Sequence, residues 1–197
     1  MSNAPFIVGI GGTTGEGSAT ESALRVALGS AERHGARTRL FGGAALQALP
    51  HYVRGEENVA AELIEAVRAA DGLILASPGY HGSISGLVKN AVDYLEATSR
   101  DARVYLDGLP VGLIVTAYGW QATGSTLATL RSIVHALRGW PTPLGAAIKS
   151  EAGMFDGGTC LDAPAAAQLS LVGEQVVEFS RLRQRAPAIT RTETPAG

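Results

Sequence analysis

Short apolar runs alternate along the chain with longer segments in which apolar residues recur every three or four positions. The short runs have the length of strands and cover 6–10, 36–41, 72–77, 110–116 and 142–148. The longer segments have the periodicity of helices and cover about 19–34, 59–69, 86–97, 125–137 and 164–183. Strands that alternate with helices are typical of βαβ units, which assemble into a parallel sheet.

Five such units predict an α/β fold with a doubly wound, five-stranded parallel sheet in the strand order 2-1-3-4-5. In that order the crevice for ligands lies at the carboxyl ends of strands one and three. Right-handed crossovers bring the segments after strands one, three and four to this same edge. We expect residues 1–186 to form a single domain. Residues 187–197 have no apolar periodicity, which predicts a flexible C-terminal tail.

Composition excludes several classes of protein. The chain has 197 residues, 46% of them hydrophobic and 17% charged, which is enough apolar material for a sizeable core. A net charge of −2 without clustered Lys and Arg disfavours nucleic acid as a partner. Cys160 is the only cysteine, and no apolar run approaches the roughly 20 residues of a membrane span. With no signal-peptide pattern after Met1, we expect a cytoplasmic protein without a membrane partner.

The segment after the first strand, GGTTGEGSAT at 11–20, combines glycines with hydroxyl side chains. Glycines let the backbone approach an anion closely, and the helix that follows adds free amides at the positive end of its dipole. The sequence therefore predicts a phosphate cradle. Its candidate residues are Gly12, Thr13, Thr14, Ser18, Ala19 and Thr20. Ser18 and Glu21 also fit a capping box, in which the hydroxyl serves the helix instead.

This segment is not a dinucleotide fingerprint. The glycine spacing is wrong, and the second strand ends in Leu40 and Phe41 rather than in an acidic residue. We therefore expect a mononucleotide, with one phosphate cradle.

The segment after the third strand reads SPGYHGS at 77–83 and runs directly into the helical segment 86–97. A proline, two glycines and an aromatic residue stand at the edge where open α/β sheets bind ligands. The segment after the fourth strand, 116–125, adds Gly119 and Trp120 to the same edge. Four scattered histidines, His34, His51, His81 and His135, lack the spacing of a metal site, and we predict none.

The segments SPGYHGS (77–83) and KNAVD (89–93) resemble the "PEYN-G-S…KN-A-D" loop of the NAD(P)H-dependent FMN reductases, a flavodoxin-like family. The segment 11–20 resembles that family's "G-S-x-R-x-x-S-x-T" signature, with Ser18 and Thr20 at its closing hydroxyls. The resemblance covers roughly residues 6–140. Departures include the absence of an arginine from the phosphate segment, Gly79 in place of Glu, and His81 in place of Asn.

The resemblance implies a flavodoxin-like fold that binds FMN, takes a hydride from NAD(P)H and passes electrons to free flavin or a small acceptor. It places the flavin ring against Pro78, Gly79, Tyr80, His81, Gly82, Ser83, Tyr118, Gly119 and Trp120. No catalytic acid is needed for hydride transfer, and we name no catalytic residue. The resemblance also implies a homodimer or homotetramer and allows a partner monooxygenase supplied with reduced flavin.

Three alternatives remain open. In the first, the acceptor is a quinone, an azo compound or a metal oxyanion rather than free flavin. In the second, the protein is an electron carrier of the flavodoxin type. In the third, it is an accessory protein that has lost the flavin. The near-neutral charge disfavours the carrier, because such carriers are usually strongly acidic.

Overall fold

The computed structural model describes residues 4–15, 17–156 and 158–186. Its main sheet has five parallel strands in the order β2 (Arg37–Phe41), β1 (Phe6–Gly11), β3 (Gly72–Tyr80), β5 (Pro110–Ala117) and β6 (Trp140–Lys149). The two-residue strand β4 (Ser83–Ile84) pairs antiparallel with the end of β3. The predicted parallel α/β sheet is confirmed, and its order is compatible with the prediction. The five predicted parallel strands are present, and β4 is an additional antiparallel strand in a segment that we expected to be a loop.

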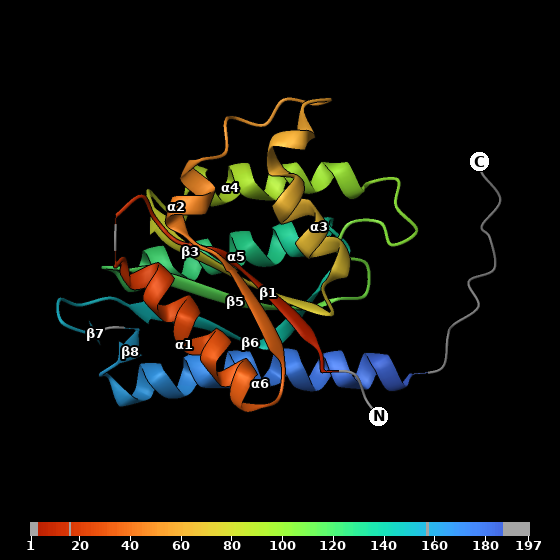
Figure 1. Ribbon diagram of the computed structural model, residues 1–197. Coiled ribbons are helices and arrows are strands. Elements are labelled where there is room, and N and C mark those ends of the chain that lie inside the picture. The colour runs from red at the N-terminus through yellow and green to blue at the C-terminus, as the bar shows by residue number, and fades with distance from the viewer. Residues whose placement is uncertain (1–3, 16, 157, 187–197) are drawn as a thin grey trace.

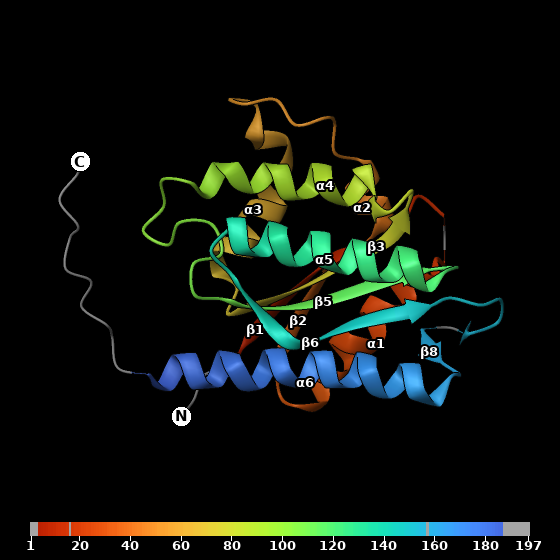
Figure 2. The same cartoon turned by 180° about the vertical axis from the view of Figure 1, so that it is seen from behind.

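Helices cover both faces of the sheet, as the continuously apolar strands predicted (Figures 1 and 2). One face carries α1 (Ala19–Arg33) and α6 (Ala163–Arg185), and the other carries α3 (Ala61–Ala69), α4 (Gly86–Asp93) and α5 (Trp120–Ala136). Neighbouring residues of a strand point to opposite faces. Ile74 therefore packs with the α1–α6 layer, while Leu73 and Leu75 pack with the other layer.

Several short elements did not show in the sequence pattern, because two to five residues are too few for a period. They are α2 (Gly43–Gln47), η1 (Glu57–Ala60), β7 (Phe155–Asp156) and β8 (Thr159–Cys160). The predicted helical segment 86–97 is divided into α4 and the 3-10 helix η2 (Tyr94–Thr98). The predicted tail 187–197 lies outside the described residues. Within the described ranges, no helix is both long and apolar enough to cross a membrane.

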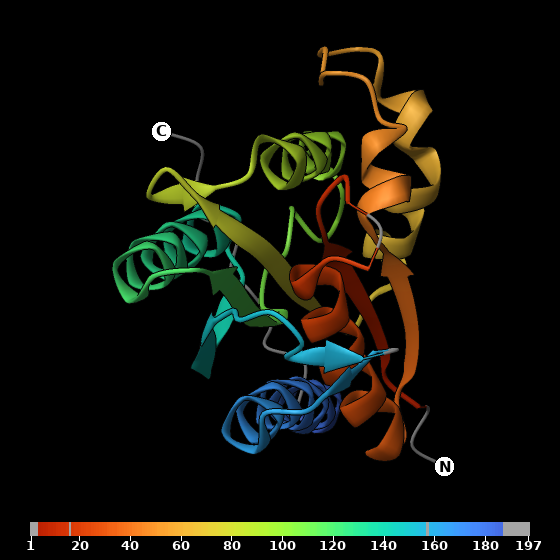
Figure 3. The same ribbon diagram turned by 90° about the vertical axis from the view of Figure 1, so that its left-hand side faces the viewer.

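The carboxyl ends of the parallel strands meet at one edge of the sheet, on the left of Figure 1 and facing the viewer in Figure 3. The start of α1, the start of α2, the β3–β4 hairpin and the β7–β8 hairpin gather at this edge. Right-handed crossovers put these connections on the same side, as the sequence predicted.

Candidate functional site

The described residues 12–15 and 17–18, here called the phosphate loop, pack directly on the backbone at the start of α2. A Cβ atom on Gly12 would lie 2.6 Å from the Gly43 nitrogen, and one on Gly43 would lie 1.8 Å from the Thr13 carbonyl oxygen. Gly12 also has a φ of +141°, which favours glycine. Gly42 and Gly43 were not among the candidate residues predicted from the sequence. Their position as a glycine pair directly after the second strand could have identified them.

The hydroxyl groups of this region already make bonds within the protein. Ser18 is the N-cap of α1, and its Oγ accepts a hydrogen bond of 3.3 Å from the Glu21 N–H. The Thr13 Oγ1 accepts from the Gly15 N–H at 3.1 Å. Thr20 is only 1% exposed, and its Oγ1 lies 2.6 Å from Thr116 Oγ1 of β5. The Thr20 hydroxyl therefore ties α1 to the sheet, and a contact of Thr20 with a phosphate stays a prediction.

The remaining groups of the phosphate loop fit an anion. The amides of Ala19 and Thr20 stand in the first turn of α1, where an N–H has no acceptor within the helix. Thr14 is exposed at the loop surface, and the Ser18 hydroxyl keeps a proton to donate. These donors sit at the positive end of the dipole of a 15-residue helix, a favourable environment for a phosphate.

The predicted capping box is only half formed. The Glu21 side chain does not return to Ser18; its Oε2 accepts a hydrogen bond of 2.9 Å from the Gly43 N–H, and its Oε1 pairs with Arg25 Nη2 at 2.7 Å. Partial burial acts to raise the pKa of the Glu21 carboxyl. The hydrogen bond from Gly43, together with the hydrogen bond and positive charge of Arg25, outweighs this effect of burial. The pKa of Glu21 therefore lies below its ordinary value.

The segment that we expected to be a loop after the third strand is a β-hairpin. β3 continues through Pro78 and Gly79 to Tyr80, which pairs with Ser83 of β4. The two turn residues both have positive φ, 50° at His81 and 82° at Gly82, as in the type I′ turn that suits a two-residue hairpin. Proline and glycine are poor strand residues, which is why the sequence pattern ended this strand too early.

The base of the hairpin is fixed by buried hydroxyl groups. Ser77 Oγ donates to the Pro78 carbonyl at 2.9 Å and accepts from the Ser85 N–H at 3.0 Å. Ser85 in turn caps α4, because its Oγ accepts from the Val88 N–H at 3.2 Å. These contacts hold the hairpin in one orientation relative to the sheet.

Gly79 has no side chain because α5 packs closely against it. A Cβ at this position would lie 3.0 Å from Thr126 Oγ1 and 3.1 Å from Ala117 Cβ. The buried Thr126 hydroxyl has no hydrogen-bond partner among the described residues. A side chain at position 79 would therefore require these neighbouring atoms to shift, which is consistent with glycine in place of the family's Glu.

Beyond its base the hairpin is open to solvent, and it faces the segment after β5. Tyr80 is 52% exposed, and His81, Gly82 and Ser83 are exposed as well. After β5, Tyr118 is 88% exposed and Gly119 forms the N-cap of α5. Trp120, predicted to lie in a loop, is instead the first residue of α5 and is 66% exposed.

Three large aromatic side chains are thus exposed at the carboxyl edge, where the phosphate loop also lies. Exposed aromatic groups of this size offer flat surfaces for a planar ring. The backbone cradle at Gly12 and the donors at the start of α1 suit the phosphate of FMN, and the hairpin with Tyr118 and Trp120 suits its ring. The residues present therefore fit FMN. The contacts of each candidate residue with it stay predictions.

The KNAVD word serves the structure. Asn90 Oδ1 accepts from the Tyr52 N–H at 2.8 Å, and its Nδ2 donates to the Pro50 carbonyl at 2.8 Å, which fastens the segment after α2 to α4. Lys89 and Asp93 form an ion pair of 2.5 Å on the same helix. These contacts give residues 89–93 a role in holding the structure together.

A groove of about 510 Å³ lies away from the carboxyl edge, on the α4–α5 side, and Tyr52, Lys89, Val92 and Ile133 help to line it. It contains none of the loops that parallel sheets use for ligands, so we place the candidate site at the carboxyl edge. Among the described residues, no three His, Cys, Asp or Glu side chains gather as a metal site would require.

Comparisons with known proteins agree with this geometry. Residues 5–153 match the family model described as NADPH-dependent FMN reductase. An FMN-dependent NADPH-azoreductase of Staphylococcus aureus (strain USA300) is 43% identical over 82 residues, which cover 42% of this chain and 40% of that protein. Its counterpart in Staphylococcus haemolyticus (strain JCSC1435) is 36% identical over 118 residues, which cover 58% of this chain and 59% of that protein. The chain thus spans less than two thirds of the length of these relatives.

Among solved structures, the flavoenzyme NAD(P)H:(acceptor) oxidoreductase FerB of Paracoccus denitrificans superposes with a TM-score of 0.71 at 19% identity. The superposition covers 91% of this chain and 98% of that one. At this identity the likeness shows the shared flavodoxin-like fold alone.

Proposed function

Because the chain belongs to the NADPH-dependent FMN reductase family, we propose that it is an FMN-dependent oxidoreductase that takes a hydride from NAD(P)H and reduces free flavin or another small acceptor. One observation carries this proposal: the glycine cradle at the start of α1 and the exposed aromatic residues Tyr80, Tyr118 and Trp120 lie at the same edge of the sheet. An anion site and a flat-ring site on one edge suit a flavin mononucleotide.

Each part of the site has a separate task in binding. The amides of Ala19 and Thr20 and the hydroxyls of Thr14 and Ser18 bind the phosphate. The hairpin residues 80–83 and the pair Tyr118–Trp120 hold the ring and keep one of its faces open to solvent. Because the same open face receives the nicotinamide and then the acceptor, we expect ping-pong turnover.

The chemistry belongs to the cofactor: when bound, FMN accepts the hydride and passes electrons on. The protein binds the cofactor, orients it and stabilises the charge that develops on it. When FMN is bound, backbone N–H groups of the hairpin or of residues 118–120 would stabilise the negative charge that develops on the ring. His81 is exposed in the turn, and we expect it to donate a hydrogen bond to the ring. We assign no residue as a general acid.

Within the alternatives for the acceptor, the aromatic edge favours a planar aromatic compound such as a flavin, a quinone or an azo dye. A metal oxyanion calls for free cations. The cations at this edge, Arg25 and Lys149, are paired with Glu21 and Glu151. The names of the staphylococcal relatives make an azo compound the acceptor to test first.

The assembly that we propose is a homodimer, or a homotetramer built from dimers. The α4–α5 groove supports it, because Val92, Ile133 and Leu137 are apolar and the Lys89–Asp93 pair is self-complementary about a twofold axis. We also propose a cytoplasmic location, where NAD(P)H is available, and supply of reduced flavin to a monooxygenase as one use of the product.

The test is direct. The purified protein should be yellow or take up FMN on addition, with FMN bound more tightly than FAD because one cradle holds one phosphate. It should then oxidise NAD(P)H in the presence of free FMN, a quinone or an azo dye. Failure to bind any flavin would favour an accessory protein without flavin. Flavin binding without NAD(P)H oxidation would favour an electron carrier.

A further inference from the structure

Glu21 places a carboxylate at the base of the phosphate loop. The residue stands in the first turn of α1, and its side chain enters a space that three glycines leave open. Its Oε2 would lie 3.4 Å from a Cβ on Gly12 and 2.6 Å from a Cβ on Gly42, and it accepts the Gly43 N–H at 2.9 Å. A Cβ on Gly42 would force the Glu21 carboxylate to move, whereas one on Gly12 would be in ordinary contact with it.

The bond to Gly43 fixes the surface on which the phosphate loop rests. Gly12 and Thr13 pack on the Gly43 backbone with no space for a side chain. An N–H at the start of the five-residue α2 has no acceptor within that helix, and Glu21 provides one from a different element. The carboxylate therefore connects the start of α1 with the start of α2 beneath the phosphate loop.

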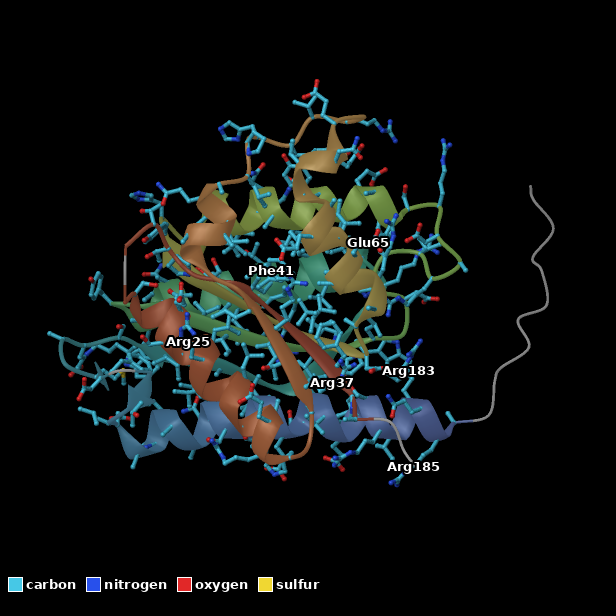
Figure 4. All side chains as sticks on the ribbon, in the orientation of Figure 1. Arg25, Arg37, Phe41, Glu65, Arg183 and Arg185 are labelled. Carbon is cyan, nitrogen blue, oxygen red and sulfur yellow. The ribbon has the colours of Figure 1, made fainter. Side chains whose placement is uncertain are left out.

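A carboxylate so close to a bound phosphate would repel it unless its charge were balanced. Arg25, one turn further along α1, supplies the balance through Nη2 at 2.7 Å and Nε at 3.2 Å from Glu21 Oε1. Figure 4 shows Arg25 on α1 at the carboxyl edge of the molecule. Residues 11–20 lack the arginine of the family signature, and Arg25 brings a cation to Glu21 beside them.

We propose that Glu21 is the positioning residue that sets the shape of the phosphate loop, and that Arg25 neutralises it so that the loop accepts an anion. This inference rests on the proposed function, in which the loop binds the phosphate of FMN. It assigns the Glu21–Arg25 pair to anion binding as a unit, although neither side chain is expected to touch the phosphate.

The test compares four variants with the wild type. Glu21→Ala removes the acceptor, Glu21→Gln keeps an acceptor oxygen without the charge, and Arg25→Gln leaves the carboxylate unbalanced. Glu65→Ala is the matched control, because Glu65 pairs with Arg68 at 2.6 Å on α3, on the opposite side of the molecule in Figure 4. Affinities for FMN and riboflavin are measured by flavin fluorescence, amide exchange of Gly43 by NMR without flavin, and folding by thermal melts.

For Glu21→Ala we expect faster exchange at Gly43 and an FMN affinity lower by about tenfold or more, with riboflavin affected much less because it has no phosphate. Glu21→Gln should keep the Gly43 protection and bind FMN at least as well as the wild type. Arg25→Gln should weaken FMN binding by about tenfold at low salt and much less at high salt, because salt screens the repulsion. Glu65→Ala should leave the ratio of FMN to riboflavin affinity unchanged.

A Glu21→Ala protein with wild-type exchange at Gly43 and a wild-type ratio overturns the positioning role. If that variant does not fold, Glu21→Gln and Arg25→Gln test the proposal. A ratio of FMN to riboflavin affinity in Arg25→Gln that equals the wild-type ratio at low salt overturns the neutralising role. A wild type that binds no flavin defeats the proposed function instead, and the exchange of Gly43 in the flavin-free variants then still tests the role of Glu21.

Discussion

The phosphate loop and the β3–β4 hairpin share one edge of the sheet but are built in opposite ways. A Cβ on Gly12 would lie 2.6 Å from backbone, whereas one on Gly82 would meet nothing nearer than Ser125 Oγ at 3.9 Å. The phosphate loop is held by neighbours distant in sequence, and the tip of the hairpin only by its own turn. Substitutions in the first should therefore lower stability and binding together, while those in the second should lower binding with a smaller loss of stability.

The largest effect is expected for Gly43→Ala. The new methyl group would fall 1.8 Å from the Thr13 carbonyl oxygen, so that the phosphate loop and α2 must separate. We expect FMN binding to be lost and the free energy of unfolding to fall by about 2–3 kcal/mol. Thermal melts and FMN titration measure both. Gly86→Ala is the control, because a Cβ at Gly86 meets no atom within 4 Å, and a wild-type melt for Gly43→Ala would contradict the comparison.

Gly82→Val tests the hairpin. Its φ of +82° is one that a β-branched residue adopts only with strain, and the branched side chain would occupy the space of the ring. We expect FMN binding to be abolished while the free energy of unfolding falls by no more than about 1–2 kcal/mol. If the variant binds FMN normally, the hairpin is not the flavin site and the proposed function loses its main support.

Ser18→Ala separates capping from ligand binding. Loss of the cap on the Glu21 N–H should lower the free energy of unfolding by about 1 kcal/mol. Loss of the donor should weaken FMN binding by about 1–3 kcal/mol. Ser18→Gly is the matched control, because glycine at an N-cap lowers the free energy of unfolding by only about a few tenths of a kcal/mol. Like Ser18→Ala, it lacks the hydroxyl that would bind the phosphate. Equal FMN affinity in both variants and the wild type would leave Ser18 as a cap only.

The smallest effect concerns pH. The pKa of Glu21 is lowered in the folded protein from its ordinary value of 4.5, so between the two values the unfolded chain binds more protons. The stabilisation is complete above the ordinary pKa and is lost as pH falls through the lowered one. We expect the melting temperature of the wild type to approach that of Glu21→Gln in acid, as scans between neutral pH and pH 3 would show. A difference that stays constant with pH would contradict the ion pair.

Much of the site could be located from sequence because its position follows from topology. The apolar strands and helical periods predicted a parallel sheet, and the glycine-rich segments after strands one, three and four then had to share its carboxyl edge. The segments that carry the candidate residues lie at that edge, and their contacts with a flavin stay predictions. Some of their conformations were not predicted: Pro78 and Gly79 extend β3, and Trp120 begins α5, because cross-strand and helix contacts override local preference.

The order of strands and helices, the edge that gathers glycines and aromatic residues, and the family resemblance of residues 77–83 could all be derived from the sequence. Those features depend on the period of apolar positions and on residue type, both of which are local. Three contacts became visible with the folded chain: Thr20 bonds Thr116, Gly79 makes room for α5, and Glu21 reaches Gly43. Each of these joins residues distant along the chain, and the partner of a polar group is chosen by what packing brings within hydrogen-bond distance.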